Sequence, residues 1–272
     1  FQAEHGIRDL VRSRGLGDVY KRQGYNALGA DTTGSSNTAV GHAAADAITT
    51  GNYNTALGRN ALGANTTANA NTAIGYYALF NATTNIHTAV GFEALKDNTT
   101  GGNNTAVGMN CLLANTTGTE NTALGALALD AVTTNSYNTA IGYQALTSNT
   151  ACCNTAVGRN AMAVNTTGES NTAVGLNALS SNTTASYNSC VGHGAGQSLT
   201  TGASNTIMGA RAGDAITTGA SNTIIGQAAG SVGSNMDDNV LVGLTAGYNG
   251  NSVHFNKNVA PVSYTHLTLP TK

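Results

Sequence analysis

The stretch "NTAVGRNAMAVNTTGES" occupies residues 154–170, and residues 171–187 repeat it closely as "NTAVGLNALSSNTTASY". The pattern recurs along most of the chain in steps of 17 residues, with two steps of 16. Its units begin at Asn37, Asn54, Asn71, His87, Asn104, Asn121, Asn138, Asn154, Asn171, Asn188, Asn205, Asn222 and Asn239. A repeat this short cannot hold a helical hairpin, but it suits one coil of a β-solenoid. The sequence therefore predicts an all-β, parallel β-solenoid of about thirteen to fourteen 17-residue coils.

The unit reads N-T-A-(V/I/L)-G-x-x-A-L, followed by a polar stretch that contains N-T-T-G. The Gly at position 5 indicates a corner with positive φ or a site without room for a Cβ atom. These corner glycines are Gly41, Gly58, Gly75, Gly91, Gly108, Gly125, Gly142, Gly158, Gly175, Gly192, Gly209, Gly226 and Gly243. Position 1 is Asn in every unit but that of His87, and stacked amides of successive coils can bond one another. The predicted Asn ladder is Asn37, Asn54, Asn71, Asn104, Asn121, Asn138, Asn154, Asn171, Asn188, Asn205, Asn222 and Asn239.

Positions 3 and 9 change together along the chain. Position 9 is Leu or Met from Leu62 to Leu179 and becomes Gly from Gly196 onward. Position 3 is Ala as far as Ala173, and it is Ile or Leu from Ile207 onward. Volume lost at one position reappears at the other, as a close-packed interior requires. We infer that both positions fill the same interior space, the alternative being a drift between two repeat subfamilies.

Position 4 is apolar in every unit, from Val40 to Val242. If position 3 points inward, position 4 points outward, because side chains alternate along a strand. An uncovered apolar stripe is unusual on a monomer, and another copy of the chain would cover it. The pattern therefore predicts a homo-oligomer. The alternative arrangement places position 4 inside and the small position 3 outside.

The two ends do not follow the repeat. Residues 18–23 read "DVYKRQ" and residues 262–271 read "VSYTHLTLPT", and both resemble the translated adapter of a transposon-based sequencing library. We therefore expect residues 1–23 and 262–272 to be non-native and exclude them from fold reasoning. The expected solenoid domain is 24–247, and residues 248–261 are expected to begin a truncated downstream segment. On this interpretation the chain is an internal fragment.

Composition narrows the class of function. The whole chain carries 11 basic and 13 acidic residues, and residues 24–261 hold five basic and ten acidic ones, a balance of about −5. That balance leaves no basic patch for nucleic acid. No apolar run is long enough to span a membrane. The four cysteines lack zinc-site spacing, Asp is too sparse for calcium repeats, and no cofactor motif occurs. We expect Cys111 and Cys190 to be small buried hydrophobes.

The strings "NTAVG", "NTAIG" and "NTIIG" resemble the head repeats of trimeric autotransporter adhesins (YadA-like) and related repeats of phage and bacterial tail-fibre-like proteins. The resemblance covers about residues 24–247. It implies a left-handed β-roll of three chains that forms a rod on the outside of a cell or virion. The 17-residue unit and its A-L pair depart from the shorter adhesin repeat, which slightly favours the tail-fibre-like branch.

Side-chain variety is greatest at positions 6 and 7, directly after the Gly. The candidate binding residues there are Arg59, Tyr76, Tyr77, Phe92, Tyr143, Arg159, His193 and Arg211, with simple exposure as the plainer interpretation. The leading functional hypothesis is a structural and adhesive rod, without catalysis, whose partner is a cell-surface glycan or protein receptor. The alternatives are an ice-binding solenoid, since Thr dominates position 2, and the shaft of a fibre-borne glycan depolymerase. Asn65, Asn81, Asn98, Asn115, Asn165 and Asn182 begin N-x-T strings, which we interpret as turn chemistry rather than glycosylation acceptors.

Overall fold

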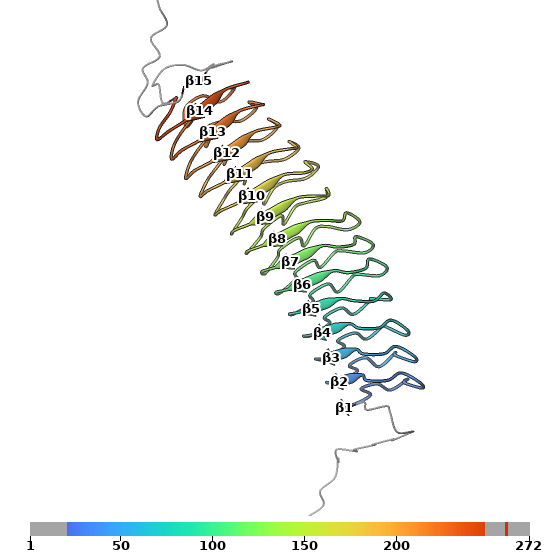
Figure 1. Ribbon diagram of the computed structural model, residues 1–272. Helices are drawn as coiled ribbons and strands as arrows, with labels where there is room; N and C mark the ends of the chain where they lie inside the picture. Colours follow the sequence, from blue (N-terminus) through green and yellow to red (C-terminus); the bar gives the residue numbers. More distant parts are fainter. Residues whose placement is uncertain (1–20, 248–258, 261–272) are drawn as a thin grey trace, which may run out of the picture. The chain divides into compact units, whose positions relative to one another are not determined.

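The computed structural model of this chain describes residues 21–247 and 259–260. Most of the expected adapter sequence, residues 1–20 and 262–272, lies outside the described residues, as do residues 248–258 and 261 of the expected downstream segment. Within the described residues no α-helix forms, and every regular element is a short β-strand (Figure 1). The predicted all-β, parallel β-solenoid is confirmed.

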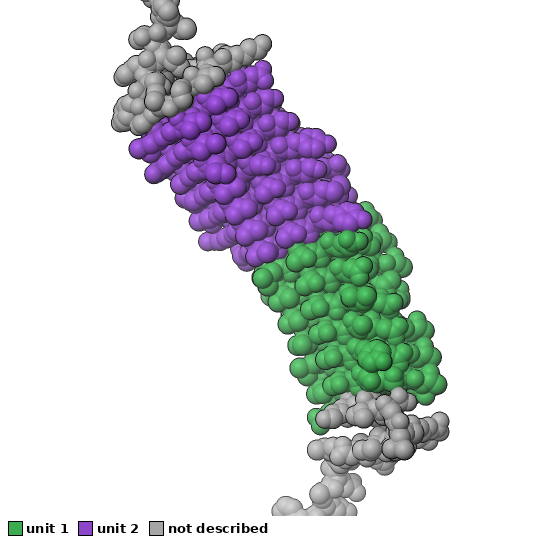
Figure 2. Space-filling view, viewed as in Figure 1, with its two compact units in different colours: residues 1–134 green, residues 135–272 purple. Residues whose placement is uncertain are grey.

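The chain forms two compact units, residues 1–134 and 135–272 (Figure 2). Unit 1 contains β1 (Lys21–Gln23), β2 (Thr38–Val40), β3 (Thr55–Leu57), β4 (Thr72–Ile74), β5 (Thr88–Val90), β6 (Thr105–Val107) and β7 (Thr122–Leu124). Unit 2 contains β8 (Thr139–Ile141), β9 (Thr155–Val157), β10 (Thr172–Val174), β11 (Ser189–Val191), β12 (Thr206–Met208), β13 (Thr223–Ile225), β14 (Val240–Val242) and β15 (Val259–Ala260). In each unit every strand pairs in parallel with the next strand along the sequence.

Each coil contributes one three-residue strand, made of repeat positions 2 to 4. The register matches like with like: between β3 and β4, Ala56 lies opposite Ala73 and Leu57 lies opposite Ile74. The middle residue of each strand from β2 to β14 is buried, and its two neighbours are half-buried or exposed. The prediction that position 3 points inward and position 4 outward is therefore confirmed.

The sheet reaches beyond the expected solenoid limits at both ends. Strand β1 pairs Lys21 with Thr38 and Gln23 with Val40, although residues 21–23 belong to the expected adapter sequence. Strand β15 pairs Val259 with Val240, in the segment expected to lie downstream of the solenoid. Parallel pairing uses backbone N–H and C=O groups, which every residue except Pro supplies, so it does not require the side chains of the repeat.

The glycine at position 5 follows each strand at a sharp corner. All thirteen corner glycines have φ between 131° and 143°, a region that other residues rarely adopt. A Cβ atom on Gly175 would lie 2.4 Å from the carbonyl oxygen of Gly192 in the next coil. The corner therefore needs Gly both for its backbone angle and for the close stacking of coils.

The apolar part of the interior consists of small and aliphatic side chains, and buried asparagines occupy the rest. Positions 3, 8 and 9 are buried along the described coils. A Cβ atom on Gly213 would lie 3.1 Å from Cδ1 of Ile207, and one on Gly247 would lie 2.9 Å from Cδ1 of Leu241. Side chains of position 3 thus occupy the space that position 9 leaves empty, and the inferred volume exchange is confirmed.

Position 9 also has an unusual backbone conformation. Leu62, Leu179 and the other leucines at this position have positive φ, as does Gly213 in a late coil. A left-handed conformation costs a residue with a side chain roughly 1–2 kcal/mol, a cost that Gly avoids. The change from Leu to Gly therefore relieves backbone strain at the same time as it moves volume to position 3.

Candidate functional site

The amides at position 1 form a buried ladder that connects successive coils. Oδ1 of Asn171 accepts hydrogen bonds from the backbone N–H of Asn188 at 2.9 Å and from its Nδ2 at 3.3 Å. Nδ2 of Asn188 also donates to the carbonyl of Gly202 in its own coil, at 3.0 Å. Each amide therefore closes its own coil and bonds to a neighbouring coil, which makes the ladder a structural element.

His87 replaces one Asn of the ladder and keeps the same bonding. Its backbone N–H donates to Oδ1 of Asn71 at 3.0 Å, and its Nδ1 accepts from the backbone N–H of Asn104 at 3.3 Å. Nε2 lies 2.9 Å from Oγ1 of Thr84. Burial lowers the pKa of His87 to about 4, so the imidazole is neutral at pH 7. A neutral ring can accept at Nδ1 as the Asn oxygen does.

Asparagines at position 12 form a second ladder, which was not predicted from the sequence. Nδ2 of Asn115 donates to Oδ1 of Asn98 at 2.6 Å, and Nδ2 of Asn182 donates to Oδ1 of Asn165 at 2.8 Å. Like Asn65, these amides are fully buried, so they are closed to glycosylation in the folded chain. The regular spacing of the N-T-T strings is the sequence feature that could have predicted this ladder. Val132 and Leu199 occupy position 12 in two coils, so the spacing is not regular along the whole chain.

The outer surface of each sheet presents two parallel columns, which we call the strand face: position 2, which is Thr except at Ser189 and Val240, and the apolar residue at position 4. In unit 1 the apolar column is Val40, Leu57, Ile74, Val90, Val107 and Leu124, and in unit 2 it is Ile141, Val157, Val174, Val191, Met208, Ile225 and Val242. Leu57 is 46% exposed and Met208 is 48% exposed, and no described residue covers them.

Four rings of unit 1 form an aromatic cluster: Tyr76, Tyr77, Phe80 and Phe92. The rings of Tyr76 and Phe92 stack nearly parallel across two coils, with centroids 5.3 Å apart. Tyr77 contacts Tyr76 and Phe80 edge-on, with centroids 4.6 and 4.8 Å apart. Tyr76 is 38% exposed and Phe92 is 48% exposed, so the cluster presents aromatic surface to solvent. Phe80, at position 10, was not among the candidates.

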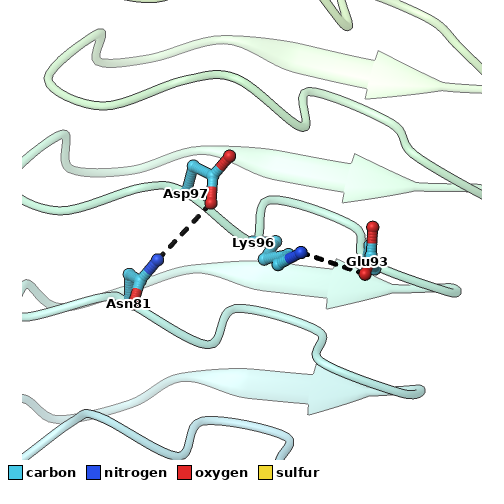
Figure 3. Close-up of polar contacts among 4 residues, drawn as sticks. All are labelled: Asn81, Glu93, Lys96 and Asp97. Atoms are coloured by element: carbon cyan, nitrogen blue, oxygen red, sulfur yellow. Dashed lines mark hydrogen bonds and ion pairs between the residues drawn. The ribbon is translucent and has the colours of Figure 1, made fainter.

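Two cations flank this cluster. The guanidinium of Arg59 lies 5.9 Å from the centroid of Tyr76, and Nζ of Lys96 lies 5.6 Å from that of Tyr77. Lys96 also forms an ion pair of 3.0 Å with Glu93, and its hydrogen bond to Glu93 raises the pKa of Lys96. Figure 3 shows this pair beside the contact of Asn81 with Asp97, where Nδ2 donates to Oδ1 at 3.4 Å. The edge of the cluster therefore carries both signs of charge.

The candidates of unit 2 are more dispersed. The guanidinium of Arg159 lies 5.9 Å from the ring centroid of Tyr143, which brings those two residues together. The exposed Arg211 forms an ion pair of 3.3 Å with the half-buried Asp214. His193 is exposed, and Arg211 has left-handed φ. The structure thus joins Arg59, Tyr76, Tyr77 and Phe92 into one surface and leaves the other candidates as smaller contacts.

The part of the chain that the structure describes contains no group of three His, Cys, Asp or Glu residues placed to hold a metal ion. In the same part there is no helix that is long and apolar enough to cross a membrane. Asp237 and Asp238 are the adjacent carboxylates, and Oδ1 of Asp237 accepts from the backbone N–H of Ala220 at 2.8 Å. That carboxylate thus contributes to joining two coils. Comparison with protein-family models, with curated proteins and with solved structures gave no match to this chain.

Proposed function

We propose that this chain is the repeated shaft of an extracellular fibre, a structural and adhesive rod on the surface of a cell or virion. Copies of the chain associate side by side through the strand face, as three chains in the arrangement that the repeat resemblance implies. The observation that carries the proposal is the uncovered apolar column at position 4. Large exposed apolar surfaces mark sites of association in soluble proteins.

The energetics favour such association. A Val or Leu side chain contributes about 1.5–3 kcal/mol when it is fully buried. The position 4 residues are only partly buried within one chain, so a further part of that free energy is available in each coil. The Thr column lies next to it and supplies hydroxyl groups that can hydrogen-bond across an interface. In a regular repeat, the small free-energy contributions of the individual coils add along the interface.

Adhesion is assigned to the aromatic cluster with Arg59 and Lys96. Aromatic rings and Arg are enriched in the residues that dominate binding, because they bring large rigid surfaces and a polar group. Such a surface suits a cell-surface glycan or a protein receptor. A fluorescently labelled chain is expected to bind cells that display the glycan or protein receptor. A Tyr76→Ala, Phe92→Ala double variant is expected to bind those cells at least about tenfold more weakly. Tyr187→Ala, at an exposed Tyr in unit 2, is the control. Equal binding by the double variant would exclude the cluster as the adhesive surface.

Ice binding is the second candidate, and the Thr column is the observation that favours it. Thr55 lies opposite Thr72, and Thr206 lies opposite Thr223, so the hydroxyls repeat in register. Parallel strands lie about 4.8 Å apart, which gives this column a regular spacing. Thermal hysteresis of the purified chain would support ice binding. Ice binding and the association of chains would both use the strand face. A strand face that is buried between chains therefore cannot bind ice.

A further inference from the structure

Two adjacent cysteines lie at the surface of unit 2. Cys153 is exposed and Cys152 is half-buried, and both are free thiols. The sulfhydryl of Cys153 donates to Sγ of Cys152, with the two sulfur atoms 3.0 Å apart. They occupy the final turn of the coil that begins at Asn138, which has 16 residues instead of 17. Neither the solenoid core nor the proposed adhesive surface uses them.

The backbone on both sides of this pair is fixed. The carbonyl of Ala151 accepts hydrogen bonds from Nδ2 of Asn138 at 3.0 Å and from Nδ2 of Asn149 at 2.7 Å. The backbone N–H of Cys153 donates to the carbonyl of Ser136 at 3.3 Å, and Cys153 has φ of 64°. The turn therefore holds the two thiols together, which reduces the conformational entropy that a bidentate ligand must remove.

The pair suits chelation better than an internal disulfide. Adjacent Cα atoms are about 3.8 Å apart, whereas disulfide-bonded cysteines usually have Cα atoms about 4.4–6.8 Å apart. A disulfide between neighbours is thus strained and easily reduced. A ligand atom that bridges the two sulfurs does not require them to approach to bonding distance.

The number of sulfur ligands selects the class of ligand. Thiolates prefer soft ions, and a closed structural zinc site takes four protein ligands. Across the described residues no third Cys, His, Asp or Glu joins this pair in a metal-binding group. A monosubstituted trivalent arsenical needs only two further bonds, because its organic group fills the third valence. We propose that Cys152 and Cys153 form a vicinal dithiol site that chelates trivalent organic arsenicals.

The reaction balances without an oxidant or reductant. With an arylarsine oxide, two As–S bonds form and the As–O bonds break, and the two thiol protons leave with the oxygen as one water molecule. Arsenic stays trivalent, and both sulfurs keep their oxidation state. The close contact with the Cys153 thiol and burial raise the pKa of Cys152 to about 11, so Cys152 is a protonated thiol at pH 7 and contributes one of the two protons that leave with the oxygen.

The site can be tested with phenylarsine oxide and the reduced 272-residue chain. We expect one phenylarsenic group per chain by intact mass and the loss of two titratable thiols. A dithiol such as dimercaptopropanol should reverse the adduct, whereas a monothiol at equal thiol concentration should not. Cys152→Ser and Cys153→Ser should each lower the affinity by at least about a hundredfold, because each removes one arm of the chelate.

Two controls isolate the pair and its geometry. Cys111→Ala with Cys190→Ala restores the usual residue of the repeat at both buried positions and should leave binding unchanged. A synthetic peptide of residues 147–157, which keeps the two cysteines but lacks the neighbouring coils, should bind at least about tenfold more weakly. Adduct formation by Cys153→Ser with unchanged affinity, or equal affinity of peptide and folded chain, would overturn the proposal.

Discussion

Early and late coils fill the same interior from different backbone positions. In the coil of Asn171, Leu179 occupies the centre and position 3 is Ala173. In the coil of Asn205, Ile207 occupies the centre and position 9 is Gly213. The backbone at position 9 keeps the same left-handed conformation in both. One coil path therefore accepts two different distributions of interior volume.

What does not change between these coils is equally informative. Position 4 remains apolar, as Val174 in one coil and Met208 in the other, although both side chains point outward. The corner Gly remains as well. Since the interior was rearranged without affecting position 4, the interior does not explain why that position is apolar. The proposed contact with another copy of the chain would explain it.

Charges in the constant outward column should have the largest effect. Val107→Asp, Ile141→Asp and Val174→Asp together would place carboxylates in the proposed interface, at a cost of several kcal/mol each when buried without a partner. We expect the assembly to dissociate or the chain to unfold, as followed by light scattering and circular dichroism. Thr105→Ser, Thr139→Ser and Thr172→Ser are the matched controls and should leave the assembly intact. A triple Asp variant with the assembly state of the parent would show that position 4 lies outside any interface.

A substitution at the constant corner should be next in size. The Cβ atom of Gly175→Ala would clash with the backbone of Gly192, and its φ of 137° is unfavourable for Ala. We expect a loss of about 3–5 kcal/mol in the free energy of unfolding. Gly102→Ala, where a Cβ atom meets nothing within 4 Å, should change it by less than about 0.5 kcal/mol. Similar denaturant midpoints for both variants would contradict the proposed role of the corner.

The exchanging positions can be tested by moving a late-coil core into an early coil. Leu179→Gly should cost about 2–4 kcal/mol, the loss of a buried side chain less the backbone strain that Gly removes. Adding Ala173→Ile should recover part of that loss, because its side chain enters the vacated space. Ala173→Ile alone should destabilise the chain by overpacking. Urea unfolding of the four proteins gives the coupling, and strict additivity would mean that the two positions do not share space.

The smallest expected effect concerns His87. Its pKa is about 4 in the folded chain and 6.5 in the unfolded chain, so the unfolded state binds the extra proton between these values. The contribution of His87 to the free energy of unfolding is therefore constant above about pH 6.5. It falls as the pH is lowered toward 4, by about 2 kcal/mol at pH 5. His87→Asn, which restores the ladder, should remove this part of the pH dependence. An identical acid dependence in both proteins would show that His87 does not titrate in this way.

The sequence was sufficient for the fold because each coil repeats the same few constraints. The strict period identified the solenoid, and the coupled change at Ala173 and Ile207 revealed which positions face inward. Three other features could not be predicted from the sequence. The left-handed backbone at Leu179 is unusual for Leu, and nothing in the composition indicates it. The second Asn ladder was hidden because Val132 and Leu199 interrupt it. The aromatic cluster includes Phe80 because position 10 of one coil lies beside position 7, a neighbourhood that depends on the path of the turn.

Sedimentation equilibrium of the 272-residue chain at micromolar concentration tests the central claim most directly. The apolar strand face predicts a stable assembly at three times the mass of one chain, with no monomer at equilibrium in this range. A soluble, folded monomer under these conditions would contradict the proposal. The exposed strand face would then be open to solvent, and the ice-binding candidate would become the stronger explanation of its Thr column.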